Sequence, residues 1–236
     1  MPVQPRRAYE SDAATETVRL SGVGFGYAAT HRALRDVNLT LPAGSFHFLT
    51  GASGAGKSTL LKLLTLAEQP LTGTLHLFGE DATAAPRRAL PAFRRRMGMV
   101  FQDFRLLDHL SAFDNVALPL RLAGGKQADY AGDVEEMLDW VGLGDRMDDH
   151  PPSLSGGEKQ RLAIARAVVA GPELILADEP TGSVDAKMGE RLLKLFQSLN
   201  RLGATVLIAS HDEALAERSG ATILRLEGGR LTGGAA

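Results

Sequence analysis

A glycine-rich segment followed by Lys57 and Ser58 has the residue types and spacing that bind phosphate groups. Residues 51–59 read GASGAGKST, which fits the pattern G-x-x-x-x-G-K-[ST]. The glycines let successive backbone N–H groups turn inward around phosphate oxygens, where a Cβ would obstruct them. Lys57 supplies a mobile cation for the outer phosphates, and the Ser58 hydroxyl is placed to ligate Mg²⁺. The pattern predicts a nucleoside-triphosphate site, and a glycine-rich turn without a ligand is the alternative.

Two adjacent acids, Asp178 and Glu179, follow an apolar run at 174–177. The run reads LILA, which is typical of a strand covered on both faces. Ligands of open α/β sheets sit outside the carboxyl ends of the strands. We therefore expect Asp178 to approach Mg²⁺, directly or through water, and Glu179 to lie near an attacking water. A solvated strand end is the alternative for either acid alone.

The segment LSGGE at 154–158 begins a second helical stretch whose backbone is open. Ser155 stands where a helix cap is expected, and Gly156 and Gly157 leave the backbone accessible to a close ligand. These residues predict a capped helix whose N-terminus can receive an anion. An ordinary cap without a ligand is the alternative.

These groups need a scaffold of strands and helices, which the hydrophobic pattern predicts. An apolar run at 46–50 precedes the glycine loop, and a helical pattern at 57–66 follows it. Further strands are expected at 18–27, 33–41, 73–79, 97–101, 174–177 and 205–209, with a hairpin at 221–231. Further helices are expected at 86–96, 111–122, 129–141, 156–169 and 187–202. The order predicts an α/β nucleotide-binding core with a helical insertion.

We expect one structured domain at 18–231 between a disordered tail at 1–17 and a short tail at 232–236. The first tail is polar, carries prolines and shows no hydrophobic period. The nucleotide-binding core is expected at 18–101 and 171–231. Residues 102–170, where the pattern is mostly helical, are expected to form the inserted subdomain.

Composition and charge narrow the classes of protein. The chain of 236 residues has no cysteine, which excludes disulfides and thiolate metal sites. Its formal net charge of −2 gives no case for a nucleic-acid partner. No run approaches the roughly 18–20 apolar residues of a membrane span, and the beginning lacks the apolar middle of a secretory signal. We expect a cytoplasmic protein whose membrane role comes through a partner.

Six motifs resemble, in order, those of the ABC-type ATPases. They are the Walker A loop at 51–58, the Q-loop at Gln102, an LSGGQ-like signature at 154–158, Walker B with the catalytic glutamate at 174–179, the D-loop at 183–185 and the switch histidine at His211. The match extends over 18–231. The resemblance implies an ATP hydrolase that uses ATP and Mg²⁺. Its implied fold is an α/β P-loop NTPase (ABC ATPase) core with an N-terminal antiparallel β subdomain and an inserted α-helical subdomain.

The resemblance also implies a role for individual residues. Tyr27 resembles the aromatic residue that stacks on adenine, and an edge-strand aromatic without that role is the alternative. Gln102 resembles the glutamine that reaches Mg²⁺ and the attacking water, Glu179 the general base and His211 the histidine that contacts the γ-phosphate. The implied catalytic residues are Glu179, His211, Lys57 and Gln102. The implied ATP-binding residues are Tyr27, Ser53, Gly54, Ala55, Gly56, Lys57, Ser58 and Thr59, and the implied Mg²⁺ ligands are Ser58, Gln102 and Asp178.

In this family the signature residues of one subunit face the phosphate loop of another. The resemblance implies a homodimer that forms on ATP binding and encloses two ATP molecules head to tail. The residues implied to act in trans are Ser155, Gly156, Gly157 and Asp185. Ser183 stands where relatives usually have Asn, which leaves the coupling through the D-loop open.

Several segments resemble the cell-division branch of the family, the FtsE type. They are 48–64, 94–107, 114–120 and 164–169. This likeness implies an integral membrane partner resembling FtsX, control of cell-wall hydrolysis and a peripheral position on the inner face of the cell membrane. The alternatives are the ATPase of a lipoprotein-release or macrolide-efflux complex, and a nucleotide-gated scaffold in which turnover is dispensable. A soluble DNA-repair or translation protein of this family is a further alternative, disfavoured by the single cassette and the lack of a basic arm.

Four apolar side chains follow Gln102 in a segment rich in turn residues. Phe104, Leu106, Leu107 and Leu110 predict a groove for a partner helix. Packing of the inserted helices against the core is the equal alternative. A group of arginines at 87, 88, 94, 95 and 96 is expected to be a solvated helix face, with a lipid-headgroup contact as the alternative.

Overall fold

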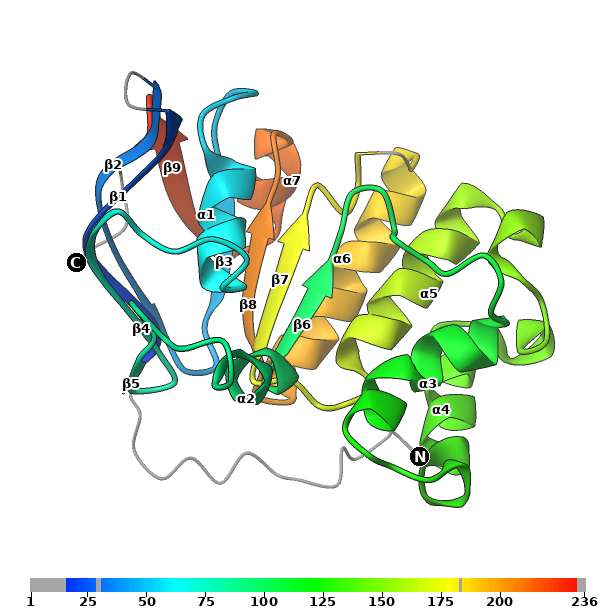
Figure 1. Ribbon diagram of the computed structural model, residues 1–236. Helices are drawn as coiled ribbons and strands as arrows, with labels where there is room; N and C mark the ends of the chain where they lie inside the picture. The colour runs from blue at the N-terminus through cyan, green and yellow to red at the C-terminus, as the bar shows by residue number, and fades with distance from the viewer. Residues whose placement is uncertain (1–15, 29–30, 183, 233–236) are drawn as a thin grey trace.

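The computed structural model describes residues 16–28, 31–182 and 184–232, which form two sheets with helices around them (Figure 1). The four-stranded sheet consists, in order, of β2 (His31–Pro42), β1 (Glu16–Ala28), β4 (Thr72–Leu77) and β5 (Glu80–Asp81). The six-stranded sheet consists of β10 (Arg230–Thr232), β9 (Thr222–Glu227), β3 (Phe46–Thr50), β8 (Thr205–Ala209), β7 (Leu174–Asp178) and β6 (Met97–Val100).

The four-stranded sheet is antiparallel and has one buried face. Val18 lies opposite Leu41, and Leu20 lies opposite Leu39, and all four are buried. Arg19, between them in sequence, points to the other face and is exposed. This alternation is what a strand with one apolar face requires.

The six-stranded sheet is parallel from β9 to β6, and only β10 runs antiparallel, to β9. Its central strands are buried on both faces: every residue of β8 is buried, as are the first four of β7. Continuous apolar runs form such strands because no face meets water. The carboxyl ends of these strands therefore lie along one edge of the sheet, where ligands of α/β proteins bind.

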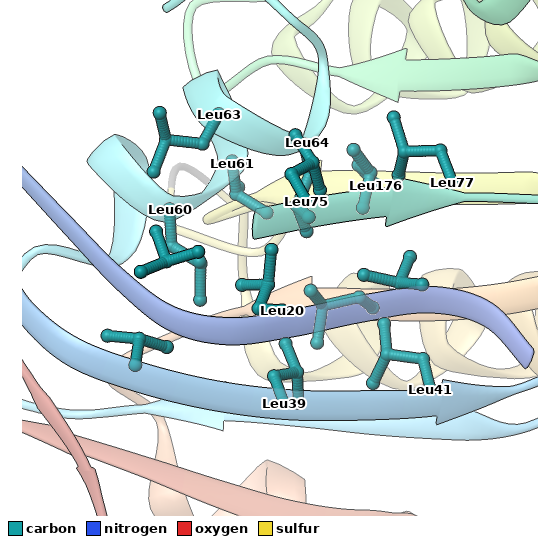
Figure 2. Close-up of a cluster of buried hydrophobic side chains, with 14 of the residues drawn as sticks. Leu20, Leu39, Leu41, Leu60, Leu61, Leu63, Leu64, Leu75, Leu77 and Leu176 are labelled. Carbon is teal, nitrogen blue, oxygen red and sulfur yellow. The ribbon is translucent and has the colours of Figure 1, made fainter. Parts of the chain in front are cut away.

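Helix α1 (Lys57–Leu64) lies between the two sheets and contacts both β2 and β7. Leucines from β1, β2, β4, β7 and α1 meet there in one cluster, which Figure 2 shows from within. Leu60, Leu61, Leu63 and Leu64 of α1 are all at most 1% exposed. Burying a leucine side chain stabilises the fold by about 1.5–3 kcal/mol, so this cluster fixes α1, and with it the loop before α1, against the sheets.

Helix α2 (Leu90–Arg95) packs through Phe93 in the same cluster as α1. The other helices cover the opposite face of the parallel sheet or stand beyond β6 (Figure 1). They are α3 (Ala112–Leu122), α4 (Gln127–Trp140), α5 (Gly156–Val168), α6 (Ala186–Arg201) and α7 (Glu213–Arg218), with short 3₁₀ turns at Gly144–Arg146 and Pro151–Ser153. Side chains of α3, α4 and α5 form a core cluster of their own, which includes Val116, Val134 and Leu162. This separate cluster supports the proposed helical subdomain at 102–170. None of the helices in the described ranges combines the length and the apolar character that crossing a membrane requires.

The predicted elements are present, with corrections at their ends. The tail predicted at 1–17 is wrong for its last two residues, because β1 begins at Glu16 and the Thr17 hydroxyl lies 2.8 Å from that of Thr205. The tail predicted at 232–236 is wrong for Thr232, which pairs with Arg225 in β10. The helix predicted at 86–96 is shorter, and α7 and β5 were not predicted. Ser183 lies outside the described residues.

Candidate functional site

The glycine loop at 51–56 joins β3 to α1 in a conformation that side chains would block. Gly51 has φ +150° and Gly56 has φ +111°. A Cβ would lie 2.3 Å from the Leu226 carbonyl oxygen at residue 51 and 2.7 Å from the Ala33 carbonyl oxygen at residue 56. Within the described chain no side chain caps α1, so its first N–H groups remain available to a ligand. The loop is thus a cradle for an anion.

Lys57 folds back over this loop. Its Nζ donates to the carbonyl oxygen of Gly51 at 2.7 Å and to that of Ala52 at 3.4 Å, and it lies 3.6 Å from Glu179 Oε1. Only 7% of the residue is exposed. The ammonium group therefore stands over the anion cradle, where a phosphate oxygen can replace its carbonyl partners.

Three contacts, one with Ala209 and two with His211, hold Glu179 in place. Its backbone N–H donates to the Ala209 carbonyl oxygen at 2.8 Å, and its Oε2 accepts from the His211 backbone N–H at 3.2 Å and lies 2.9 Å from His211 Nδ1. Its φ of +47° is a left-handed conformation that costs a residue other than glycine about 1–3 kcal/mol. Its side chain is 12% exposed. Strain at such a site is a feature of functional residues, and it fixes the carboxylate beside Lys57.

Asp178 ends β7 beside the phosphate loop. Burial raises the pKa of its carboxyl group, and a hydrogen bond with the Ser58 hydroxyl opposes that effect. Its Oδ1 is buried and has no hydrogen-bond partner among the described residues. Such an unsatisfied oxygen next to a hydroxyl is the donor set that a hard divalent cation takes. The residues present therefore fit Mg²⁺.

Gln102 lies at the same edge of the sheet, two residues after the end of β6. Val100 of β6 pairs with Ala177 of β7, so Gln102 leaves the sheet next to Asp178. Its side chain is exposed, and within the described ranges it makes no hydrogen bond. It is therefore free to turn toward a ligand.

Tyr27 lies on the other side of the loop, where β1 approaches α1. It is 55% exposed, and its hydroxyl accepts a hydrogen bond from Lys62 Nζ of α1 at 3.2 Å. Phe25 packs edge-on against its ring at a centroid distance of 5.0 Å. An aromatic ring is thus partly presented to solvent beside α1, the helix that follows the phosphate loop.

The signature segment forms the cap that its residues predict. Ser155 Oγ accepts from the Glu158 backbone N–H at 3.4 Å, while Glu158 Oε2 accepts from the Ser155 N–H at 2.8 Å. These two reciprocal hydrogen bonds form a capping box at the start of α5. A Cβ at Gly156 would meet nothing within 4 Å, so the N-terminus of α5 is open to solvent. Asp185 caps α6 in the same way, accepting from the Met188 N–H at 2.9 Å.

One chain does not bring the signature segment to the phosphate loop. Across the described residues, no hydrogen bond joins Ser155, Gly156, Gly157 or Asp185 to residues 51–59. Figure 1 shows α1 and α5 far apart, with β7, β6 and α6 between them. The structure therefore gathers Lys57, Asp178, Glu179, His211 and Gln102 at one edge, and leaves the signature residues at another place.

The four apolar residues predicted to form a partner groove after Gln102 differ in their packing. Leu106 packs against the core cluster of α3, α4 and α5, as the packing alternative requires. Phe104, Leu107 and Leu110 are half-buried and belong to none of the core clusters.

Two residues that bind this segment were not predicted. Asn115 is fully buried in α3 and bonds to the backbone of Leu107, Leu110 and Ser111. Arg166 of α5 donates to the backbone of Phe104 and Arg105. Asn115 could have been noticed as a polar residue inside an apolar helical pattern. No sequence pattern points to Arg166.

Comparison with known proteins places this site in a family. Residues 34–182 match the ABC transporter family, and the chain belongs to it. It is thus an ABC-type ATPase, which confirms the predicted class. The cell division ATP-binding protein FtsE of Escherichia coli K12 is 46% identical over 92% of this chain and 98% of its own length. FtsE of Haemophilus influenzae is 45% identical over 91% of this chain and 99% of its own.

More distant likenesses agree with this family. The methionine import ATP-binding protein MetN of Chromohalobacter salexigens is 43% identical over 83% of this chain, which spans 57% of that protein. Among solved structures, the dimeric bacterial ABC transporter cassette MJ0796 superposes with a TM-score of 0.84 at 35% identity, covering 91% of this chain and 96% of its own. A dimeric post-hydrolysis state of MJ0796, bound to ADP and Pi, gives 0.83 at the same identity and coverage.

Proposed function

We propose that this chain binds and hydrolyses ATP as a homodimer and drives an integral membrane partner in cell division. The observation that carries the proposal is the convergence of Lys57, Asp178, Glu179 and His211 at the carboxyl edge of β3, β7 and β8. A cation, a buried acid, a strained carboxylate and an imidazole together suit phosphoryl transfer to water.

The triphosphate binds in the cradle of the glycine loop. Its oxygens accept from the backbone and side chains of Ser53, Gly54, Ala55, Gly56, Lys57, Ser58 and Thr59. The N-terminus of α1 adds its dipole to this site. Lys57 exchanges the Gly51 and Ala52 carbonyl oxygens for phosphate oxygens. This exchange weakens its ion pair with Glu179.

The adenine base stacks on the exposed face of Tyr27. The hydrogen bond from Lys62 and the edge contact with Phe25 fix the orientation of the ring before a base arrives. Stacking on an aromatic ring contributes about 1–3 kcal/mol per base and discriminates little between bases.

Asp178, Ser58 and Gln102 would hold Mg²⁺. The ion would supply positive charge to the triphosphate. Asp178 would offer its Oδ1, which is buried and has no hydrogen-bond partner among the described residues. Gln102 would add its side-chain oxygen from the segment that follows β6.

Hydrolysis uses Glu179 as the general base. The carboxylate accepts a proton from water as that water attacks the γ-phosphorus and the bond to the leaving ADP oxygen breaks. His211 holds Glu179 in place before ATP binds and contacts the γ-phosphate afterwards.

The signature residues act on the ATP of a second subunit. The open N-terminus of α5 in one copy brings Ser155, Gly156 and Gly157 to the γ-phosphate bound by the other copy, with Asp185 beside them. Two observations support this: among the described residues these four make no hydrogen bond with the phosphate loop of their own chain, from which α5 stands apart in Figure 1, and the solved cassette MJ0796 is dimeric. Hydrolysis removes the γ-phosphate that joins the copies, so they separate.

Removal of Mg²⁺ tests the proposed function. The purified chain should release phosphate from ATP in a Mg²⁺ buffer, and excess EDTA should stop the reaction, because Asp178 and Ser58 then have no cation to share with the phosphates. Addition of Mg²⁺ beyond the EDTA should restore it. Phosphate release that is equal with and without free Mg²⁺ would contradict the role assigned to Asp178.

The cell-division role rests on the likeness to FtsE of two genera over nearly the whole of both chains. We propose a partner resembling FtsX and a position on the cytoplasmic face of the cell membrane, held through that partner. The likeness to MetN supports a second candidate, the ATPase of an importer. Identifying the integral membrane protein that co-purifies from native membranes separates the two.

We propose that Phe104, Leu107 and Leu110 receive a helix of that partner. They are half-buried side chains outside the core clusters, in the segment that follows Gln102 in the sequence. Partner helices commonly dock with an apolar face in such grooves.

Leu107→Asp should reduce the amount of membrane partner that co-purifies by about tenfold or more, because a buried charge in an apolar contact is costly. The control is Leu71→Asp, since Leu71 is 69% exposed and lies in the loop between α1 and β4, where its backbone bonds to Gly24 of β1. Thermal melting checks that both variants fold. Normal recovery of the partner with folded Leu107→Asp would rule out the groove.

A further inference from the structure

A hollow of about 390 Å³ lies between the four-stranded sheet and strand β10. Pockets that bind small molecules have volumes of roughly 300–1,000 Å³. None of the residues proposed to bind ATP or Mg²⁺ lines this hollow. Gly22 and Gly24 of β1 line it with backbone alone. A Cβ would lie 3.6 Å from Asp36 Oδ1 at residue 22 and 2.6 Å from Thr72 Oγ1 at residue 24, so the missing side chains keep the hollow open.

Three arginines from two elements line the hollow. Arg32 and Arg35 belong to β2 and Arg230 belongs to β10, and all three are exposed. The Arg35 backbone N–H donates to the Gly229 carbonyl oxygen at 2.7 Å, which holds the turn between β9 and β10 against β2 (Figure 1). None of the three guanidinium groups forms an ion pair with another described residue. Such a group of like charges attracts an anion.

The hollow also contains one acid. Of the described residues that line it, Asp36 alone carries a negative charge, and within the described chain it pairs with none of the arginines. Its φ of +52° is a left-handed conformation that aspartate and asparagine adopt more readily than most residues. The carboxylate is therefore available to a cationic donor of a ligand.

A phosphate ester that also carries an ammonium group matches this set of charges. Guanidinium groups bind phosphate oxygens through pairs of parallel N–H···O bonds, and a carboxylate accepts hydrogen bonds from an ammonium group. An anion without a cationic group would meet the like charge of Asp36. A ligand with both charges satisfies the arginines and the acid together.

We propose that this hollow binds a phosphate ester with an ammonium group, with Arg32, Arg35 and Arg230 on the phosphate and Asp36 on the ammonium. The site is separate from that of ATP, and it goes beyond the proposed hydrolysis. Soluble phosphate esters and lipid headgroups share this chemistry, and the experiments below distinguish the two sources.

The first test titrates phosphoethanolamine into the chain by calorimetry, with the ATP site filled by Mg²⁺ and a non-hydrolysable ATP analogue. We expect saturable binding with a Kd of about 1 mM or tighter, an affinity that three charge-assisted hydrogen bonds can supply. Arg35→Gln and Arg230→Gln should each raise the Kd by about tenfold or more, because each removes one charged donor. The control is Arg191→Gln, an exposed arginine of α6 whose side chain has no partner among the described residues, and it should bind as the unmodified chain does. Thermal melting without ligand checks that every variant folds.

Asp36→Asn separates the two ends of the ligand. Asparagine keeps the shape of the side chain and tolerates the left-handed backbone. This variant should bind phosphoethanolamine more weakly and inorganic phosphate at least as tightly as the unmodified chain, because it loses the partner of the ammonium and a charge that repels phosphate. A change of the same sign for both probes would overturn the assignment of Asp36.

Co-sedimentation with vesicles distinguishes the sources of the ligand. Binding to vesicles of phosphatidylcholine with phosphatidylethanolamine, absent with phosphatidylcholine alone and lost in Arg35→Gln, would assign the hollow to a lipid headgroup. Binding of phosphoethanolamine without binding to either vesicle would assign it to a soluble ligand. The inference would be overturned if neither form of the probe bound, or if Arg35→Gln and the unmodified chain bound it equally.

Discussion

We expect Glu179→Gln to lower the rate of phosphate release by about 10²–10⁴-fold, the contribution typical of a positioned general base. Glutamine keeps the shape of the side chain and can still accept from the His211 N–H, but it cannot take a proton from water. ATP should therefore bind and remain intact. Release of labelled phosphate in a single turnover measures the rate, and equilibrium binding of ATP measures the affinity.

The control for this variant is Glu217→Gln. Glu217 is an exposed carboxylate on α7 and makes no ion pair in the described parts of the chain. The Glu217→Gln chain should hydrolyse ATP at the rate of the unmodified chain. If Glu179→Gln kept more than about a tenth of the activity, less than the loss expected of a general base, another group would have to activate the water.

The second large effect is expected of Gly156→Leu at the open end of α5. A side chain there meets nothing in its own chain, and leucine favours a helix more than glycine does, so the monomer should fold normally. In the proposed dimer the same side chain would stand between α5 and the partner's γ-phosphate. We expect phosphate release to fall by about 10²–10³-fold, the loss typical of removing donors that face developing charge.

Gly132→Leu is the matched control. Gly132 lies on α4, where a Cβ also meets nothing within 4 Å. Both variants should melt at or above the temperature of the unmodified chain, and only Gly156→Leu should lose activity. Full activity of Gly156→Leu would mean that the N-terminus of α5 does not approach a nucleotide.

The sequence predicts the scaffold well because its strands carry local patterns. Alternation along β1 and β2 specifies one buried face, and the continuous apolar runs of β7 and β8 specify two. The glycines at 51 and 56 likewise predict their own conformation, since only glycine fits there.

Element ends and short elements depend on contacts that a local pattern does not contain. The start of β1 at Glu16 depends on a hydroxyl contact between Thr17 and Thr205, which is 188 residues away. Helix α7 has six residues and β5 has two, too few for a hydrophobic period to be read.

For the candidate site, residue types could be predicted but not their mutual geometry. The order of the motifs indicates Glu179 and His211, but their 2.9 Å contact and the left-handed backbone of Glu179 follow from the register of β7 and β8. The contacts of Arg166 also follow from tertiary structure, because its partners are backbone atoms that any sequence at 104–105 would offer.

A cross-linking experiment tests the head-to-tail dimer most directly. The chain has no cysteine, so a single introduced thiol reports one position. Ser53→Cys marks the phosphate loop and Ser155→Cys marks the signature helix, each introduced into the Glu179→Gln chain so that ATP persists. The two variants are mixed with Mg²⁺ and ATP and treated with a short bis-maleimide. We predict a covalent dimer in the mixture, dependent on ATP, and none with either variant alone. Dimers formed by one variant alone, or no ATP-dependent product in the mixture, would contradict a site shared between two copies.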